Sequence, residues 1–207
     1  KIHKILEDLK NQKVISLVSD AGTPAISDPG SNLISKCYEI GVQVRPIPGA
    51  SAILSAVSVS GFSDNFYFCG FLPKKQTELE KFLAKTKLVK ASLVFFMPAR
   101  DLGKNSKFLT KYFPKYNFLI AREMTKVHET YIKDTIVNIN KYVQDNDKGE
   151  MTLVIDNSVE EKTDINIDKE IKLLIGKMTS KNIAQYLSKK LEISKKIIYQ
   201  KVIDLNE

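Results

Sequence analysis

Residues 19–30 read SDAGTPAISDPG and follow an apolar run, residues 14–18, of the kind found in buried strands. The amphipathic residues 31–40 come next and predict a helix that ends at Gly41. Two Asp, two Gly and two Pro within this loop favour tight turns that aim polar groups. Ligands of open α/β sheets bind at loops that follow strands. We therefore expect a binding loop here; the alternative is an ordinary strand-to-helix connection.

The pattern continues as a second strand–helix pair. Residues 42–46 predict another extended segment, and Pro48-Gly49 turns the chain into a helix of small residues at 50–60. The order strand–helix–strand–helix implies a parallel sheet in this part of the chain. Residues 61–64 are predicted to be a domain boundary.

The rest of the chain also predicts alternating strands and helices. Strands are expected at residues 65–72, 92–97, 117–121, 131–132 and 151–155, with helices at 104–113 and near 135–144. Helices beginning after Ser180 and Ser194 form either a helix-turn-helix or a plain helical hairpin. The fold class is α/β, with predicted domains at 1–63 and 64–156, an acidic linker at 157–168 and a helical tail at 169–207.

The net charge of +8 is unevenly distributed along the 207 residues. Residues 73–117 carry eleven basic and three acidic side chains, a net charge of +8, and residues 169–207 carry a net charge of +5. Residues 156–168 have a net charge of −4. This segregation favours a nucleic-acid partner over a merely solvated surface. Two distant cysteines form no disulfide framework, which fits a reducing cytosol.

Several common catalytic patterns are missing from the sequence. It has no G-x-G-x-x-G or Walker A loop, no metal-ligand spacing, no nucleophile elbow and no apolar run long enough to span a membrane. Residues 122–129, REMTKVHE, instead gather ionisable and hydroxyl groups just after a predicted strand. Such a cluster is suited to general acid–base catalysis. The alternative is an ordinary solvent-exposed loop between two strands.

Five motifs in their order along the chain resemble the tetrapyrrole methylase family. They are SDAGTPAISDPG (19–30), PIPGASAILSAVSVSGF (46–62), FYFCGFLPKK (66–75), REMTKVHE (122–129) and the terminal helix pair. The family's tetrapyrrole-acting members typically have GGDP where this chain has Ala21-Gly22-Thr23-Pro24. The chain therefore resembles the branch of the family that methylates 16S ribosomal RNA on a cytidine 2'-OH.

The resemblance implies two α/β domains with S-adenosylmethionine between them, in a cytoplasmic homodimer. The implied cofactor-binding residues are Asp20, Ala21, Gly22, Thr23, Ile26, Ser51, Ala52, Met97 and Met124. The candidate catalytic residues are Glu123, Lys126 and Glu129. The basic segments supply the expected RNA contacts, which are Lys74, Lys75, Arg100, Lys189, Lys190, Lys195 and Lys196. No metal site is expected.

Two departures from the family pattern affect these expectations. The family opens with a strand and a TPIGN-type loop that this sequence does not contain, so we expect an incomplete cofactor pocket. Residues 95–100 read FFMPAR where the family usually has YESPHR, which removes a Glu and a His. The alternatives to an rRNA methyltransferase are a methyltransferase acting on a tetrapyrrole and a non-catalytic RNA-binding module.

Overall fold

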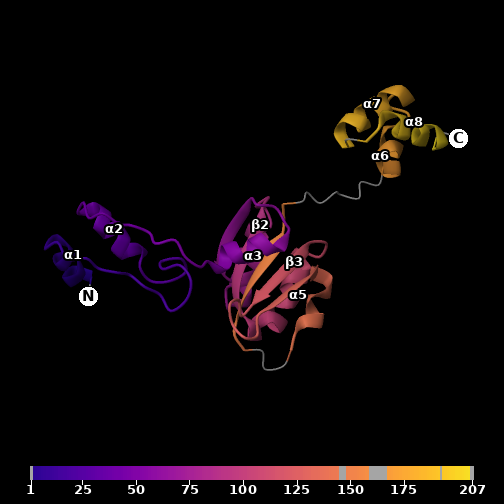
Figure 1. The fold of residues 1–207 in the computed structure, drawn as a ribbon. Coiled ribbons are helices and arrows are strands. Elements are labelled where there is room, and N and C mark those ends of the chain that lie inside the picture. The colour runs from indigo at the N-terminus through magenta and orange to yellow at the C-terminus, as the bar shows by residue number, and fades with distance from the viewer. Residues whose placement is uncertain (1, 145–147, 159–166, 192, 206–207) are drawn as a thin grey trace. The chain divides into compact units, whose positions relative to one another are not determined.

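A computed structural model describes residues 2–144, 148–158, 167–191 and 193–205 (Figure 1). The chain divides into two compact units, Lys1–Glu160 and Glu161–Glu207. The mixed α/β class and the helical tail are confirmed. Most of the predicted acidic linker, residues 159–166, lies outside the described residues.

The first unit begins with three helices and continues with a sheet and its connecting helices. Its elements in chain order are α1 (Ile2–Lys10), α2 (Ser31–Glu39), α3 (Ala52–Ser60), β1 (Phe66–Phe71), α4 (Gln76–Thr86), β2 (Ser92–Pro98), η1 (Ala99–Asp101), α5 (Leu102–Tyr112), β3 (Asn117–Arg122), β4 (Thr130–Thr135), η2 (Ile136–Tyr142) and β5 (Glu150–Asp156).

The five strands form one mixed sheet in the order β1-β2-β5-β3-β4. Strands β1 and β2 are parallel and are joined through α4, whereas β5 lies antiparallel between β2 and β3. Strand β4 pairs antiparallel with β3 at the opposite edge from β1. The carboxyl ends of β2 and β3 therefore lie beside the beginning of β5.

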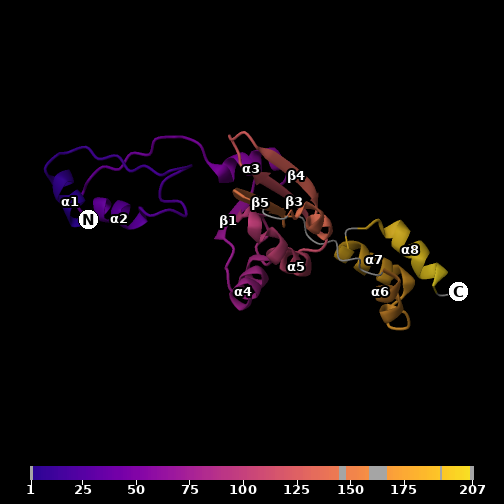
Figure 2. The ribbon, with the colours of Figure 1, turned by 90° about the horizontal axis from the view of Figure 1, so that it is seen from below.

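Alternating side chains of the central strands supply two cores on opposite faces of the sheet. Leu93, Phe95 and Met97 of β2 belong to the larger core with α4, α5 and η2. The intervening Val94 belongs to a smaller core that includes Ala56 of α3. Strands β3 and β5 show the same period of two. Figure 2 shows α3 on one face of the sheet and α4 and α5 on the other.

Helix α3 packs closely against the sheet because its contact residues are small. Ala56 and Ser60 are fully buried, and Gly61 ends the helix in a left-handed conformation at φ 62°. Lys133 of β4 donates a hydrogen bond of 2.6 Å to the carbonyl of Ser60, and its ammonium lies 4.6 Å from the ring centre of Phe62. A cation at a helix carboxyl end is favourable, so these contacts anchor α3 on the sheet.

The sequence-based division of this part of the chain into two domains, residues 1–63 and 64–156, remains a prediction.

The strands predicted at residues 14–18 and 42–46 are wrong: neither segment is a strand in the structure. Val14 and Val18 are 96% and 81% exposed, and Ile47, just beyond the second segment, is 88% exposed. A strand needs a hydrogen-bonded neighbour, and no described segment pairs with either one. The parallel sheet expected for residues 14–60 is therefore also wrong, whereas the helices at 31–40 and 50–60 are confirmed as α2 and α3.

The second unit is a three-helix cluster with its own small core. It contains α6 (Ile167–Leu174), α7 (Ser180–Leu191) and α8 (Lys195–Asp204). The helix pair was predicted, but α6 was not. The core residues of the unit are Ile171, Ile183, Ala184, Leu187, Ile198 and Val202. Because α6 contributes Ile171, the tail is more than a helical hairpin.

Asp134 at the end of β4 holds the following 3-10 helix η2 in place. Its carboxylate accepts hydrogen bonds from the amide of Thr135, the side chain of Asn138 at 2.9 Å and the hydroxyl of Tyr142 at 2.7 Å. The side-chain bond from Asn138, then those from Tyr142 and Thr135, lower the pKa of Asp134 from 3.8 to about 2.

We expect Asp134→Ala to lower the free energy of unfolding at neutral pH. The folded state favours ionised Asp134, so its contribution is present above pH 3.8 and is lost as the pH falls toward about 2. The stability difference between wild type and Asp134→Ala should therefore shrink over that range, as measured by urea unfolding at a series of pH values. A difference that stays constant down to the lowest pH would contradict this role.

Candidate functional site

The first unit contains a cavity of about 910 Å³ beside the sheet. One side is formed by the loop of residues 17–29 and the N-terminus of α3. The other side is formed by β1, the ends of β2 and β3 and the beginning of β5. The volume lies near the upper end of the ~300–1,000 Å³ typical of small-molecule pockets. This cavity is the candidate site.

All the residues that the resemblance implies for cofactor binding line this cavity. The loop and the first turn of α3 contribute seven of them and the strand ends contribute two, namely Asp20, Ala21, Gly22, Thr23, Ile26, Ser51, Ala52, Met97 and Met124. Positions as far apart as 20 and 124 thus border the same space. Their roles in binding remain predictions.

Hydrogen bonds connect the loop to the beginning of α3. The hydroxyl of Thr23 donates to the carbonyl of Ala50 at 3.2 Å, and the hydroxyl of Ser51 caps α3 by accepting from the amide of Leu54 at 3.4 Å. The hydroxyl of Ser19 bonds within the loop, to the carbonyls of Ala21 and Gly22. The first backbone amides of a helix have no intrahelical partner, so this end of α3 offers donors to the cavity.

Left-handed backbone conformations gather at the same site. Ala25, Ser27, Glu123 and Thr125 have φ between 50° and 67°, and Gly22 has φ 70°. A non-glycine residue in this region costs roughly 1–2 kcal/mol, and such strain is often found at ligand sites. Two of the four non-glycine residues belong to the loop of residues 17–29 and two to residues 122–129. Both segments therefore hold conformations that their sequences alone disfavour.

The carboxylate of Glu123 organises the second segment. It accepts hydrogen bonds from the ammonium of Lys126 and from the amide of Glu150, both at 3.1 Å. The Lys126 bond, then the Glu150 amide, lower the pKa of Glu123. A Cβ at Gly149, whose φ is 90°, would overlap this carboxylate. Glycine at position 149 therefore makes room for Glu123 against the beginning of β5.

The three candidate catalytic residues have different positions. Glu123 and Lys126 line the cavity, whereas Glu129 does not. The carboxylate of Glu129 accepts a short hydrogen bond from the amide of Thr125, within the same loop. The lowered pKa of Glu123 makes it a weaker proton acceptor than an unpaired glutamate. Glu129 thus stabilises the loop of residues 122–129 by a hydrogen bond, while Glu123 and Lys126 line the cavity.

Apolar residues from the strands complete the wall of the cavity. Met97 is buried, and its sulfur accepts a hydrogen bond from the side-chain amide of Asn105 at 3.2 Å. Four phenylalanines that were not among the predicted site residues also line this wall, Phe66, Phe68, Phe71 and Phe96. The aromatic composition of residues 65–72 was the available signal. This composition alone could not show that the rings line a site, because the sequence does not tell which face of β1 borders the cavity.

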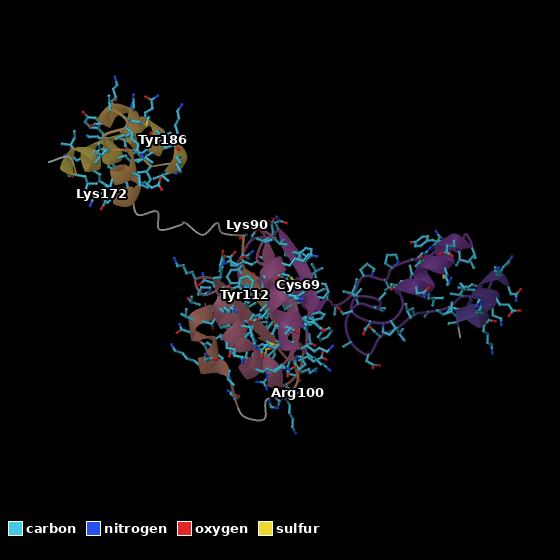
Figure 3. All side chains as sticks on the ribbon, turned by 180° about the vertical axis from the view of Figure 1, so that it is seen from behind. Cys69, Lys90, Arg100, Tyr112, Lys172 and Tyr186 are labelled. Carbon is cyan, nitrogen blue, oxygen red and sulfur yellow. The ribbon has the colours of Figure 1, made fainter. Side chains whose placement is uncertain are left out.

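None of the residues predicted to contact RNA lines the cavity. Lys74 and Lys75 follow β1 and are exposed, and Lys75 pairs with Glu78 at 3.1 Å. Arg100 is exposed on η1, directly after β2 (Figure 3). In the second unit Lys189, Lys195 and Lys196 are exposed, whereas Lys190 is bonded to Glu170 of α6 at 2.9 Å.

Residues 1–140 match the family of Tetrapyrrole (Corrin/Porphyrin) Methylases. The methyltransferase CobJ has a similar fold, with a TM-score of 0.56 at 18% identity over 76% of this chain and 70% of that one. Uroporphyrin-III-C-methyltransferase from Thermus thermophilus gives a TM-score of 0.53 at 14% identity, again over 76% and 70%. The chain belongs to the tetrapyrrole methylase family and is a methyltransferase.

Curated relatives narrow the classification. Ribosomal RNA small subunit methyltransferase I of Neisseria meningitidis serogroup A is 34% identical over 203 residues, which cover 95% of this chain and 70% of the relative. The Bacillus subtilis protein of the same name is 33% identical over 206 residues, covering 99% and 69%. Within the family, the chain belongs to the ribosomal RNA small subunit methyltransferase I group.

Two other kinds of feature are absent from the described residues. No helix among residues 2–144, 148–158, 167–191 and 193–205 is both long and apolar enough to cross a membrane. In the same part of the chain, no three His, Cys, Asp or Glu residues come together as a metal site would require.

The thiol of Cys69 is not suited to act as a nucleophile. Burial raises the pKa of this thiol to about 12, which disfavours its reactive thiolate form.

We expect Gly149→Ala to loosen residues 122–129, because the added methyl group displaces the Glu123 carboxylate. Hydrogen–deuterium exchange should show faster exchange at the amides of Thr125 and Glu150. The matched control is Gly176→Ala, where φ is also positive at 83° but no atom lies within 4 Å of the new Cβ. Both variants should lose about 1 kcal/mol of stability to backbone strain. Unchanged exchange at residues 122–129 in Gly149→Ala would contradict the role of Gly149.

Proposed function

We propose that this methyltransferase transfers a methyl group from S-adenosylmethionine to the ribose 2'-OH of a cytidine in 16S ribosomal RNA. The observation that carries the proposal is the 910 Å³ cavity, whose lining includes all nine residues of this chain that the resemblance implies for cofactor binding. The names of the curated relatives support ribosomal RNA of the small subunit as the substrate. Their coverage of almost the whole chain favours this substrate over a tetrapyrrole.

The lining of the cavity suits S-adenosylmethionine chemically. Unpaired amides at the first turn of α3, near Ala52 and Ile53, suit the carboxylate of the methionine part. Asp20 and Asp28 offer acceptors for ribose hydroxyls or the ammonium group. The apolar strand ends, including Met97 and Met151, suit the adenine. These residues would hold the cofactor, which supplies the methyl group and a sulfonium leaving group.

The residues of the chain must align and deprotonate the attacking hydroxyl. The ribose oxygen forms a bond to the methyl carbon while the carbon–sulfur bond breaks, and sulfur keeps the electron pair. The hydroxyl proton must leave to a base or to water. We assign alignment of the hydroxyl to the Glu123–Lys126 pair, because both residues line the cavity and hold each other in place. Orientation of this kind supplies much of the rate in enzymes.

The proposal also includes RNA contacts outside the cavity. Lys74 and Arg100 of the first unit, and Lys189, Lys195 and Lys196 of the second, are exposed cations that can neutralise phosphates. Lys75 and Lys190 already pair with Glu78 and Glu170, so we expect these two to contribute less to RNA binding. Assembly as a homodimer and activity in the cytoplasm remain part of the proposal through the resemblance.

The proposed activity is tested by incubating the protein with labelled S-adenosylmethionine and unmethylated small ribosomal subunits. We expect label in 16S rRNA, recovered after nuclease digestion as 2'-O-methylcytidine at one position. Label in a tetrapyrrole but not in RNA would favour the alternative substrate. Cofactor binding without transfer to either substrate would contradict the proposed activity.

We expect Gly22→Val to abolish binding of S-adenosylmethionine in calorimetry without unfolding the protein. No atom lies within 4 Å of a Cβ at Gly22, so valine adds backbone strain at φ 70° but no clash, and its side chain takes space from a ligand. The matched control is Gly41→Val, whose φ of 73° is similar and whose Cβ also meets no atom, but which lies outside the cavity lining. Equal cofactor affinity of folded Gly22→Val and Gly41→Val would remove this loop from the site.

We expect the triple variant Lys189→Gln, Lys195→Gln and Lys196→Gln to weaken the salt dependence of RNA binding. Each lost phosphate contact reduces the slope of log K against log salt by about 0.7 to 0.9. The control changes Lys172, Lys177 and Lys181 to Gln, which removes the same charge from other exposed positions of the second unit. A binding titration at several salt concentrations measures both slopes, and equal slopes would exclude a specific RNA surface formed by Lys189 of α7 and Lys195 and Lys196 of α8.

A further inference from the structure

An irregularity in β1 places an additional phenylalanine on the cavity wall. Phe68 pairs with Val94, but the next paired residue is Gly70, opposite Phe95, so Cys69 is an extra residue in β1. Side chains alternate between the faces of a regular strand, and Phe68 and Phe71 would then lie on opposite faces. The bulge at Cys69, with Gly70 at φ 76°, puts both on the face that carries α3.

The bulge creates a cluster of three aromatic rings in the cavity. The ring of Phe96 lies 4.9 Å from that of Phe68 and 5.4 Å from that of Phe71, centre to centre, with both pairs edge-to-face. All three residues line the cavity. Phe71 remains 49% exposed although Phe96 supports it. A supported but half-exposed aromatic ring is a suitable surface for stacking a planar ligand.

We propose that Phe71, supported by Phe96, stacks on the base of the cytidine whose ribose is methylated. This inference rests on the proposed function, because it names where that substrate's base binds. Proteins that recognise RNA commonly stack unpaired bases on aromatic side chains. Enzymes that act on a buried nucleotide commonly take it out of its stack into a pocket. Phe71 would hold such a base while the Glu123–Lys126 pair aligns its ribose.

The charge near Phe71 favours an RNA base over the adenine of the cofactor. Lys74 follows Phe71 by three residues and is exposed, so a cation for a phosphate lies close along the chain. S-adenosylmethionine contains no phosphate, whereas every nucleotide of RNA carries one.

Fluorescence tests the stacking directly, because the chain contains no tryptophan. Phe71→Trp introduces a single reporter, and the control Tyr67→Trp puts the same reporter on β1 at a residue that is 50% exposed and outside the cavity lining. The probe is a single-stranded 16S rRNA fragment around the methylated cytidine, with or without the base of that nucleotide. We expect quenching at position 71 by the intact fragment only, and no difference between the fragments at position 67.

Kinetics provides the second measurement. We expect Phe71→Ala to raise the KM for small subunits by about tenfold or more, the loss expected for one base–aromatic stack, with cofactor affinity unchanged. Phe71→Tyr should keep the wild-type KM, and so should Tyr67→Ala.

The outcomes separate the two proposals. Quenching of Phe71→Trp by S-adenosylmethionine alone would overturn the inference and assign the ring to adenine. Equal quenching by the intact and abasic fragments would overturn it as well. If the wild type methylates the RNA but Phe71→Ala has a normal KM, the proposed base subsite is wrong. The proposed function is then still supported. Failure of the wild type to methylate RNA would overturn both.

Discussion

The packing of α3 against the sheet is the contact on which the rest of the site depends. Ala56 has no exposed surface and packs among Val94, Leu119 and Val154, so the helix backbone comes close to three strands. Lys133 secures the opposite end of the helix through the carbonyl of Ser60. Because a helix is rigid, fixing its body fixes its N-terminus at the cavity. A bulkier residue at position 56 would move that N-terminus away from the strand ends.

The two loops at the cavity are held by contacts that offset their backbone strain. The loop of residues 17–29 is tied to α3 by the hydroxyl of Thr23, and the loop after β3 is tied to β5 by the carboxylate of Glu123. Left-handed residues persist only where surrounding contacts over-determine them. Strain of this kind keeps backbone and side chains in the positions that a ligand needs, before the ligand arrives.

The cavity and the lysine-rich surfaces are formed by different parts of the chain. The cavity is bordered by Asp20, Asp28 and apolar strand ends, which suit a small cofactor. The lysines proposed to contact RNA lie outside it, after β1 and on the second unit. In the second unit, Glu170 and Asp168 of α6 pair with Lys190 and Lys201. The contacts that we propose for the cofactor and for RNA therefore involve different residues, and variants can test them separately.

The sequence alone determined the features that depend on local patterns. The sequence predicted strands at residues 117–121 and 151–155 and the helix that became α5, and amphipathic spacing predicted α2 and α7. The turn-forming residues of 19–30 predicted a loop, because Gly, Pro and Asp act on their immediate neighbours, and that loop lines the cavity. Tertiary structure decided the pairing of β5 between β2 and β3, the unpaired state of residues 14–18 and the bulge at Cys69. It also decided the place of Glu123 over Gly149, 26 positions later in the sequence. A hydrogen-bonded partner or a collision across such a separation depends on which segments meet in space, and no local pattern specifies that.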